Sequence, residues 1–210
     1  MAIVNSRLIA AMREQLAARK HLLDDGASRV GWKLGMGDRE SIAGHIVVGY
    51  LTSATELDPG ATYRSQPTEG LHVDVEAYVE LAGATPDAIA AYGVALELVD
   101  LTPRPGEPDS IVATNIFHRA VSFAPPMGRT EPLGAQVGLR VNGELRRTNP
   151  WPEDISERLT AAAEVLDAVG MELRAGDRII TGSIVQVPVG AGDRLAAVVE
   201  EHDAVSLEIA

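Results

Sequence analysis

The chain has 210 residues, 46% of them hydrophobic and 23% charged, which is typical of a globular protein and excludes a disordered or collagen-like chain. Its 18 Lys and Arg against 30 Asp and Glu give a formal net charge of −12, and this charge argues against a nucleic-acid partner. Because there is no Cys, disulfides, thiolate catalysis and thiolate metal sites are excluded. Any metal would be held by carboxylates, imidazoles or water.

The length and the hydropathy pattern indicate the number of domains and whether the chain has a membrane-spanning segment. At about 150 residues per domain, we expect a single domain over 1–210, with a helical segment at 1–28 and a β-rich core at 29–210. No apolar run approaches the roughly 20 residues that span a bilayer, so no membrane partner is expected. Residues 1–8 lack an apolar signal core, which predicts a cytoplasmic protein.

The first predicted element is an amphipathic helix over residues 6–24. Leu8, Met12 and Leu16 recur at four-residue spacing and therefore share one face of such a helix. Gly26 follows within two residues, and glycine is a common helix stop.

From residue 30 to 144, short apolar runs alternate with Gly, Pro, Thr and Asp, a texture typical of strands and turns. Strands are predicted over 30–35, 45–51, 72–82, 93–100 and 136–142. Asn142-Gly143 predicts a hairpin turn after the last of these runs. The three prolines within 102–110 predict a loop, and Asp109 is placed as the cap of a short helix through Asn115.

A second long helix is predicted over 153–169, where apolar residues recur at helical spacing and Gly170 provides the stop. The remaining strands are predicted over residues 178–182, 184–188 and 195–209. A strand-rich chain with a helix at each end of the sequence predicts a mixed α+β fold.

The run Leu71–Leu81 alternates between polar and apolar residues. Alternate side chains of a strand point to the same face, so one face collects the polar residues His72, Asp74, Glu76, Tyr78 and Glu80. A solvated surface strand is one interpretation of that face. A metal site is the other, because carboxylates two residues apart lie roughly 7 Å from each other and can share one Mg²⁺ or Mn²⁺.

Glu97 is a single carboxylate within the apolar run 94–99. Such a run is typical of a strand that is buried on both faces, and a buried carboxylate needs a cation or hydrogen-bond donors. Two interpretations stay open: an ion pair with an arginine, or a shared metal with Asp74 and Glu76, because three converging carboxylates repel one another unless a cation lies between them.

Lys33 lies in the glycine-rich stretch 31–37, which matches neither a phosphate-binding loop nor a dinucleotide-binding fingerprint. Its apolar neighbours allow the ammonium to point inward, toward an anionic substrate. The alternative is a surface lysine whose stem covers apolar residues.

The five histidines show no metal-ligand spacing on one helix. His21 and His202 are expected at the surface. His45, His72 and His118 are each compatible with a place near a site or with a structural role. Ser183 lacks the Gly-x-Ser-x-Gly context of a hydrolase nucleophile, which argues against a serine hydrolase.

Taken together, four segments resemble the hydratase/decarboxylase branch of the fumarylacetoacetate hydrolase superfamily, which includes 2-keto-4-pentenoate hydratase and 4-oxalocrotonate decarboxylase. Their order and approximate spacing agree with that branch over nearly the whole chain. The segments are Gly31-Trp32-Lys33-Leu34-Gly35, Asp74-Val75-Glu76, Ala95-Leu96-Glu97-Leu98-Val99-Asp100, and Arg174 to Ser183.

The resemblance implies a mixed β-sheet roll around Mg²⁺ or Mn²⁺, with Asp74, Glu76 and Glu97 as the ligands. It places Lys33 near the carboxylate or enolate of a small unsaturated 2-oxo acid. It implies a hydratase or a related lyase that stabilises an enolate through the metal. It also implies a homo-oligomer.

The chain departs from the branch at two acids. Ile46-Val47-Val48-Gly49 stands where the branch has Pro-Asp-x-Gly, and Ala113-Thr114-Asn115 where it has Ala-Asp-Asn. His45 or His72 is the expected substitute for proton transfer. The departures also motivate two alternatives. One keeps the metal site but makes the chain a decarboxylase, a tautomerase, a C–C hydrolase or an enzyme of a biosynthetic step, and the other is a degenerate, non-catalytic member.

Overall fold

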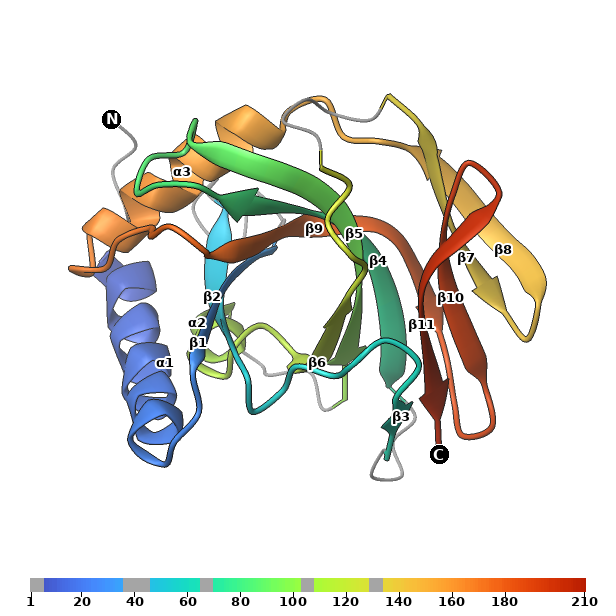
Figure 1. Ribbon diagram of the computed structural model, residues 1–210. Helices are drawn as coiled ribbons and strands as arrows, with labels where there is room; N and C mark the ends of the chain where they lie inside the picture. The colour runs from blue at the N-terminus through green and yellow to red at the C-terminus, as the bar shows by residue number, and fades with distance from the viewer. Residues whose placement is uncertain (1–5, 36–45, 65–69, 103–107, 129–133) are drawn as a thin grey trace.

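The computed structural model describes residues 6–35, 46–64, 70–102, 108–128 and 134–210. Within these ranges the chain forms three helices, α1 (Ser6–Asp24), α2 (Pro108–Ala113) and α3 (Ile155–Asp167). Figure 1 shows α1 and α3 on one side of the molecule and the small sheet β3-β11-β10-β7-β8 on the opposite side, with the larger sheet between them.

The larger sheet is mixed and strongly curled. Its strand order is β2 (Val47–Thr52), β1 (Arg29–Gly35), β9 (Arg178–Pro188), β4 (Leu71–Leu81), β5 (Ile89–Asp100) and β6 (His118–Phe123). The β1–β9 pair is parallel and the other neighbours are antiparallel. The long hairpin β4–β5 therefore lies between β9 and β6.

The smaller sheet has the order β3 (Thr62–Tyr63), β11 (His202–Ile209), β10 (Arg194–Val199), β7 (Gln136–Val141) and β8 (Glu144–Pro150). Its β7–β8 hairpin turns at Asn142 and Gly143, whose φ angles are 54° and 81°. Two consecutive positive φ angles are the signature of a type I′ turn, so the predicted hairpin is confirmed.

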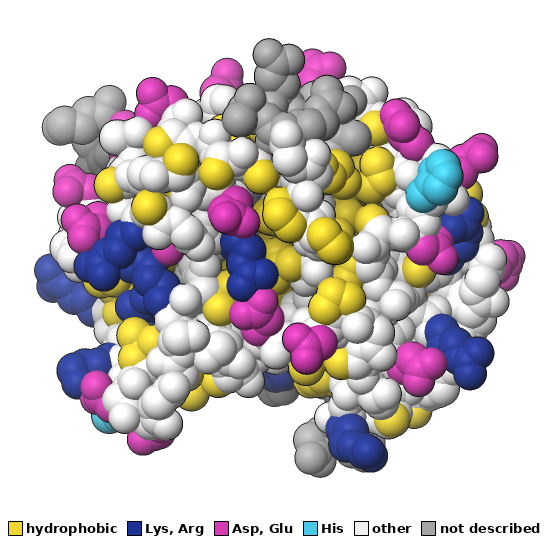
Figure 2. All heavy atoms as spheres, viewed as in Figure 1, with side chains coloured by type: hydrophobic (Ala, Val, Ile, Leu, Met, Phe, Trp, Pro, Cys, Tyr) yellow, Lys and Arg dark blue, Asp and Glu magenta, His cyan; other side chains and the backbone are white. Residues whose placement is uncertain are grey.

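One large apolar core joins the helices to both sheets. From α1 it takes Leu8, Ala11 and Met12, which share a helix face as the periodicity predicts. A smaller cluster lies on the opposite face of the six-stranded sheet and includes Tyr78, Val121, Phe123 and Ile180. On the face in Figure 2, hydrophobic side chains show near the centre and acidic ones are spread around them.

The α+β class is confirmed, and the helices and most strands lie within a few residues of their predicted bounds. Three expectations were wrong. Residues 178–188 form one strand instead of two, residues 195–209 form the hairpin β10–β11 instead of one strand, and β3, β6 and β8 were not predicted. Of the described helices, none is long and apolar enough to cross a bilayer.

Candidate metal centre

Three carboxylates converge on one face of the β4–β5 hairpin. Asp74 and Glu76 lie on β4, and Glu97 lies on β5 directly opposite Asp74. One oxygen of each lies within 4.8 Å of the others, and the three residues are 5%, 2% and 1% exposed. The alternation of β4 therefore does place Asp74 and Glu76 together, but in the interior. The surface-strand interpretation is wrong.

A local irregularity in the sheet accompanies this convergence. The pairing of β4 with β9 shifts register on both sides of Glu76. Such shifts increase local twist and redirect side chains. The backbone N–H of Gly182 on β9 donates a hydrogen bond of 2.8 Å to Glu76 Oε2, so β9 fixes one oxygen of this carboxylate.

The acids perturb one another because they are buried together. Burial, and then the charge of Glu97, raises the pKa of Asp74 to about 6. Burial and the charges of Glu97 and Asp74 raise the pKa of Glu76 well above its ordinary value. Burial also acts to raise the pKa of Glu97, but the ammonium of Lys33 and the contact with His118 outweigh it and hold that pKa low.

Lys33 points into the protein and contacts Glu97. Its Nζ pairs with Glu97 Oε1 and donates a 3.0 Å hydrogen bond to the carbonyl of Ile116, with 3% of its side chain exposed. The expectation of an inward cation fits this position, and the surface-lysine alternative does not. Glu97 therefore has an ion pair, but with a lysine and not with an arginine. Two of the three ammonium N–H donors are used by these contacts.

His118 at the start of β6 is a second partner of Glu97. Its Nδ1 lies 2.7 Å from Glu97 Oε1, and its Nε2 lies 2.9 Å from Thr55 Oγ1. Burial lowers the pKa of His118, so the ring is neutral near pH 7. Because a carboxylate only accepts hydrogen bonds, the ring proton belongs on Nδ1, and the Thr55 hydroxyl donates to Nε2.

The turn before β6 aims the Ile116 carbonyl at Lys33. Asn115, Ile116 and Phe117 have φ angles of 62°, 52° and 61°, a left-handed run that is costly for a β-branched residue. The Asn115 amide stabilises it by accepting from the Tyr50 N–H at 2.8 Å and donating to its C=O at 3.1 Å. Gly49 makes room, because a Cβ there would lie 2.6 Å from Asn115 Oδ1 and from Lys33 Cγ.

Two oxygens of the cluster have no hydrogen-bond donor within the described ranges. Asp74 Oδ1 and Glu97 Oε2 are both fully buried and unpartnered. A buried acceptor without a donor costs free energy, and carboxylate oxygens are the ligands that hard divalent cations prefer. The acids, their mutual repulsion and these orphaned oxygens all fit a bound divalent cation.

Two exposed residues of β9 lie next to the cluster. Ser183 and Gln186 on β9 are exposed, and their side chains hydrogen bond with Asp74, which partly offsets the rise in its pKa. Ser183 also lies opposite Glu76 in the β4–β9 pairing.

Unlike the acids, the two histidines predicted for proton transfer, His45 and His72, have no described contact with the cluster. His72 is half-buried, and its Nδ1 lies 2.9 Å from the carbonyl of Gly70, just before β4, so its described contact is not with the acids. His45 lies outside the described residues. His118 is the histidine that contacts Glu97. The sequence signal for His118 was its position just before the mostly apolar run 120–124, which is typical of a strand. The register of that strand opposite β5 could not be predicted.

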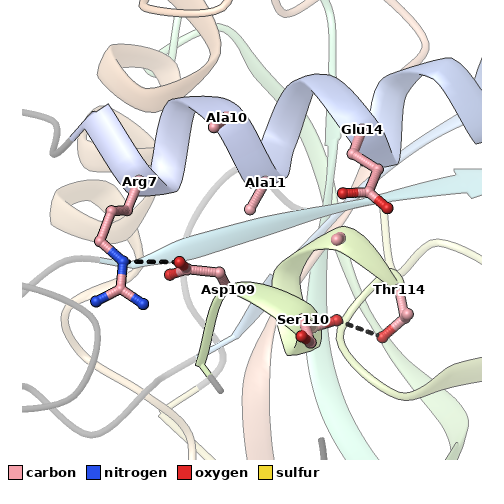
Figure 3. Close-up of a pocket in the computed structure, with 8 residues that line it drawn as sticks. Arg7, Ala10, Ala11, Glu14, Asp109, Ser110 and Thr114 are labelled. Carbon is pink, nitrogen blue, oxygen red and sulfur yellow. Dashed lines mark hydrogen bonds and ion pairs between the residues drawn. The ribbon is translucent and has the colours of Figure 1, made fainter. Parts of the chain in front are cut away.

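A separate groove of about 420 Å³ lies between α1 and α2. Figure 3 shows its wall, where Arg7 Nε contacts Asp109 Oδ2 at 2.7 Å and Thr114 bonds to the Ser110 carbonyl at 2.7 Å. None of the predicted site residues lines this groove, so it is distinct from the acid cluster.

No family profile and no curated protein matches the sequence. Solved structures do match in fold. The 4-oxalocrotonate decarboxylase from Pseudomonas putida G7, complexed with magnesium and adipate, has a TM-score of 0.85 and 19% identity, over 97% of this chain and 86% of that one. A second structure of that enzyme, with calcium and acetate, has a TM-score of 0.83 and 21% identity over the same shares.

A structure with a lower TM-score is that of an enzyme with a different activity. Fumarylpyruvate hydrolase from Pseudomonas aeruginosa, in complex with Mn²⁺ and pyruvate, has a TM-score of 0.64 and 20% identity, over 87% of this chain and 89% of that one. At these low identities the TM-scores show a shared fold, and both of these matched proteins are enzymes. The chain therefore has the fold of the fumarylacetoacetate hydrolase superfamily, as its four sequence motifs predict.

Proposed function

We propose that this chain is a divalent-metal-dependent lyase that acts on a small unsaturated 2-oxo acid, by hydration or by decarboxylation. The observation that carries the proposal is the buried triad Asp74, Glu76 and Glu97, with unpartnered oxygens on Asp74 and Glu97. Metals named with the fold neighbours, magnesium, calcium and manganese, support a hard cation.

Asp74, Glu76 and Glu97 would hold Mg²⁺ or Mn²⁺. When bound, such a cation supplies positive charge that stabilises the enolate form of a 2-oxo acid. The protein contributes the rigid placement of the three carboxylates on two neighbouring strands. Ser183 and Gln186 contribute further hydrogen bonds to Asp74.

Lys33 is the proposed group for substrate binding and charge stabilisation. Its ammonium is fixed by Glu97 and Ile116, and its remaining N–H can reach a substrate oxygen beside the acids. Burial in a site of low dielectric strengthens this interaction. His118 acts through Glu97 as a positioning residue, because both ring nitrogens are engaged by protein groups. The catalytic role given to His72 stays a prediction, as does self-association.

Isothermal titration with oxalate tests the proposal. Oxalate imitates the chelating end of an enolised 2-oxo acid. We expect binding to protein loaded with Mg²⁺ and at least 100-fold weaker binding to the metal-stripped protein. Equal binding in both states, or none in either, would contradict the proposal. Carbon dioxide release from a panel of unsaturated 2-oxo acids would then identify decarboxylation, and a gain of water would identify hydration.

A further inference from the structure

Two arginines contact the same indole on the face of β1 opposite the acid cluster. The guanidinium carbon of Arg19, on α1, lies 5.1 Å from the centre of the Trp32 ring, and that of Arg29 lies 5.2 Å from it. Trp32 is fully buried and is paired with Tyr50 across β1 and β2. The next residue along β1, Lys33, points toward the acids, so the Trp32 side chain points away from them. Figure 1 shows α1 beside these strands. We call Arg19, Arg29, Trp32 and Tyr50 the arginine site.

The two arginines of this site differ in their hydrogen bonds. Arg29 donates from Nε and Nη2 to the two carboxylate oxygens of Asp177, at 2.6 Å each, and from Nη2 to the Glu172 carbonyl at 2.8 Å. Arg19 is 7% exposed, and its guanidinium has no hydrogen-bond acceptor within the ranges that the structure describes. Arginine is almost never buried unless it is paired, so the state of Arg19 indicates a missing acceptor.

The acids that pair with its neighbours are already occupied. Both oxygens of Asp177 accept from Arg29, and Oδ2 also accepts from the backbone N–H of Arg174 at 2.9 Å. The Glu172 carboxylate pairs with the Arg174 guanidinium at 3.0 Å. Burial, and then the charge of Arg29, lowers the pKa of Arg19. Three arginines against two acids leave one excess positive charge, on a chain whose net charge is −12.

The end of the Arg19 side chain reaches the surface. Of its guanidinium nitrogens only Nε is fully enclosed, and because Nη1 and Nη2 also lack an acceptor in the described chain, the exposed part of Arg19 includes them. Tyr50 is 9% exposed, and its hydroxyl is neither fully enclosed nor bonded to a described residue. Burial raises the pKa of Tyr50 and the charge of Arg19 lowers it, so the two polar groups lie within electrostatic reach of each other. The site therefore offers a guanidinium and a hydroxyl to a ligand from solvent.

We propose that the arginine site binds a small oxyanion, a carboxylate or a phosphate, through Arg19 and Tyr50. The ligand supplies the acceptor that Arg19 lacks, and its negative charge offsets the excess positive one. A guanidinium donates to two oxygens of a carboxylate or phosphate at once, and stacking on Trp32 holds its plane in place. The site lies on the other face of β1 from Lys33 and does not depend on the proposed lyase activity.

The fluorescence of Trp32 tests the site directly. The chain has two Trp residues, so Trp32 is the only one in a Trp151→Phe background, and an anion that contacts Arg19 should change its emission. Metal-stripped protein is titrated with inorganic phosphate and with acetate, at an ionic strength held constant with sodium chloride so that screening does not change. We expect saturable binding, and the tighter of the two anions shows whether the ligand class is phosphate or carboxylate. No saturable response to either anion would overturn the site.

Variants separate binding at this site from a general effect of charge. Arg19→Met should weaken the binding of the tighter anion about tenfold, and Tyr50→Phe should weaken it about threefold. Arg13→Met is the matched control, because it removes the same charge from an exposed position of the same helix, and it should leave the affinity unchanged. Equal affinities in Arg19→Met and in the native chain would contradict the proposal.

Urea unfolding distinguishes a binding arginine from a structural one and uses the chain with both tryptophans. The tighter anion should raise the unfolding midpoint of the native protein, because a ligand of the folded state stabilises it, and should not raise that of Arg19→Met. If Arg19→Met lowers stability by the same amount with and without the anion, the arginine is structural and the proposal is wrong.

Sedimentation covers the remaining source of an acceptor. Smaller assemblies in Arg19→Met, with no effect of either anion on the native protein, would overturn the proposal, because Arg19 would then contact an acid of a second copy. If Arg19→Met fails to fold, an unchanged anion affinity in both Arg19→Lys and Tyr50→Phe would overturn it.

Discussion

The β4–β5 hairpin has one backbone and two chemically opposite faces. Val73, Val75, Leu96 and Leu98 belong to the large cluster of buried apolar side chains. The other face carries Asp74, Glu76 and Glu97 at nearly the same burial. The hydrophobic effect favours the first face, whereas the second concentrates like charges at a cost. Burial alone therefore does not distinguish a structural face from a functional one, and the partners of its polar atoms do.

The largest expected effect comes from neutralising the carboxylate that holds Lys33 and His118. Glu97→Gln should weaken Mg²⁺ binding at least 1,000-fold, because it removes one of three charged ligands and changes both partners of that ligand. Titration calorimetry of metal-stripped protein measures the affinity. Native-like Mg²⁺ affinity in this variant would mean that Glu97 is a structural acid, and the two faces would then differ less than we propose.

The apolar face offers the opposite test. Leu96 is fully buried and neighbours Glu97 on β5, so Leu96→Ala should lower the free energy of unfolding by about 3 kcal/mol through lost burial and a cavity. Mg²⁺ affinity should change less than threefold. Urea unfolding and calorimetry measure the two quantities. A large loss of metal affinity here would show that the faces are not independent.

The third test uses pH in metal-free protein. Because the folded-state pKa of Asp74 is about 6 and its ordinary value is 3.8, folding is favoured by protonated Asp74. This contribution is fully present below about pH 4 and is lost as pH rises through 6.

Asp74→Asn should accordingly gain stability relative to the native protein as pH rises, by about 2 kcal/mol between pH 4 and 7.5. Urea unfolding without metal at both pH values measures this difference, and saturating Mg²⁺ should reduce it. A difference that does not depend on pH would contradict the raised pKa.

The smallest expected effect concerns the outer contact of the cluster. His118→Gln should weaken Mg²⁺ binding about tenfold, in the range typical for a group that orients a metal ligand. Thr55→Val, which removes the hydroxyl that contacts His118 Nε2, should have a smaller effect in the same direction. A stronger loss than for Glu97→Gln would mean that His118 itself is a ligand.

Most of the candidate site could be predicted because each of its acids has a local sequence signal. Asp74 and Glu76 obey the two-residue period of β4, and Glu97 interrupts an apolar run, which are local signals. The place of His118 depends on the register of β6 against β5 and on three left-handed residues before it. No local sequence pattern predicts the register of β6. None predicts the left-handed residues either, because Ile and Phe ordinarily avoid positive φ.

The strand predictions failed for related reasons. β8 is exposed along almost its whole length and has no apolar face, so periodicity cannot reveal it. Gly182-Ser183 has the composition of a turn, which is why two strands were predicted there. In the structure β9 continues through these residues, and the Gly182 N–H bonds to Glu76. Arg158 was not singled out, because a charged residue on a helix ordinarily faces water.

The peptide between Thr181 and Gly182 connects helix α3 to the acid cluster. Its carbonyl is polarised by a cation, Arg158, and its N–H by an anion, Glu76. Hydrogen bonds at the two ends of one amide reinforce each other through its delocalised electrons, by roughly 10–30% per bond. The hydrogen bond that fixes Glu76 Oε2 is therefore stronger than an isolated backbone hydrogen bond, because Arg158 polarises the same amide from its other end.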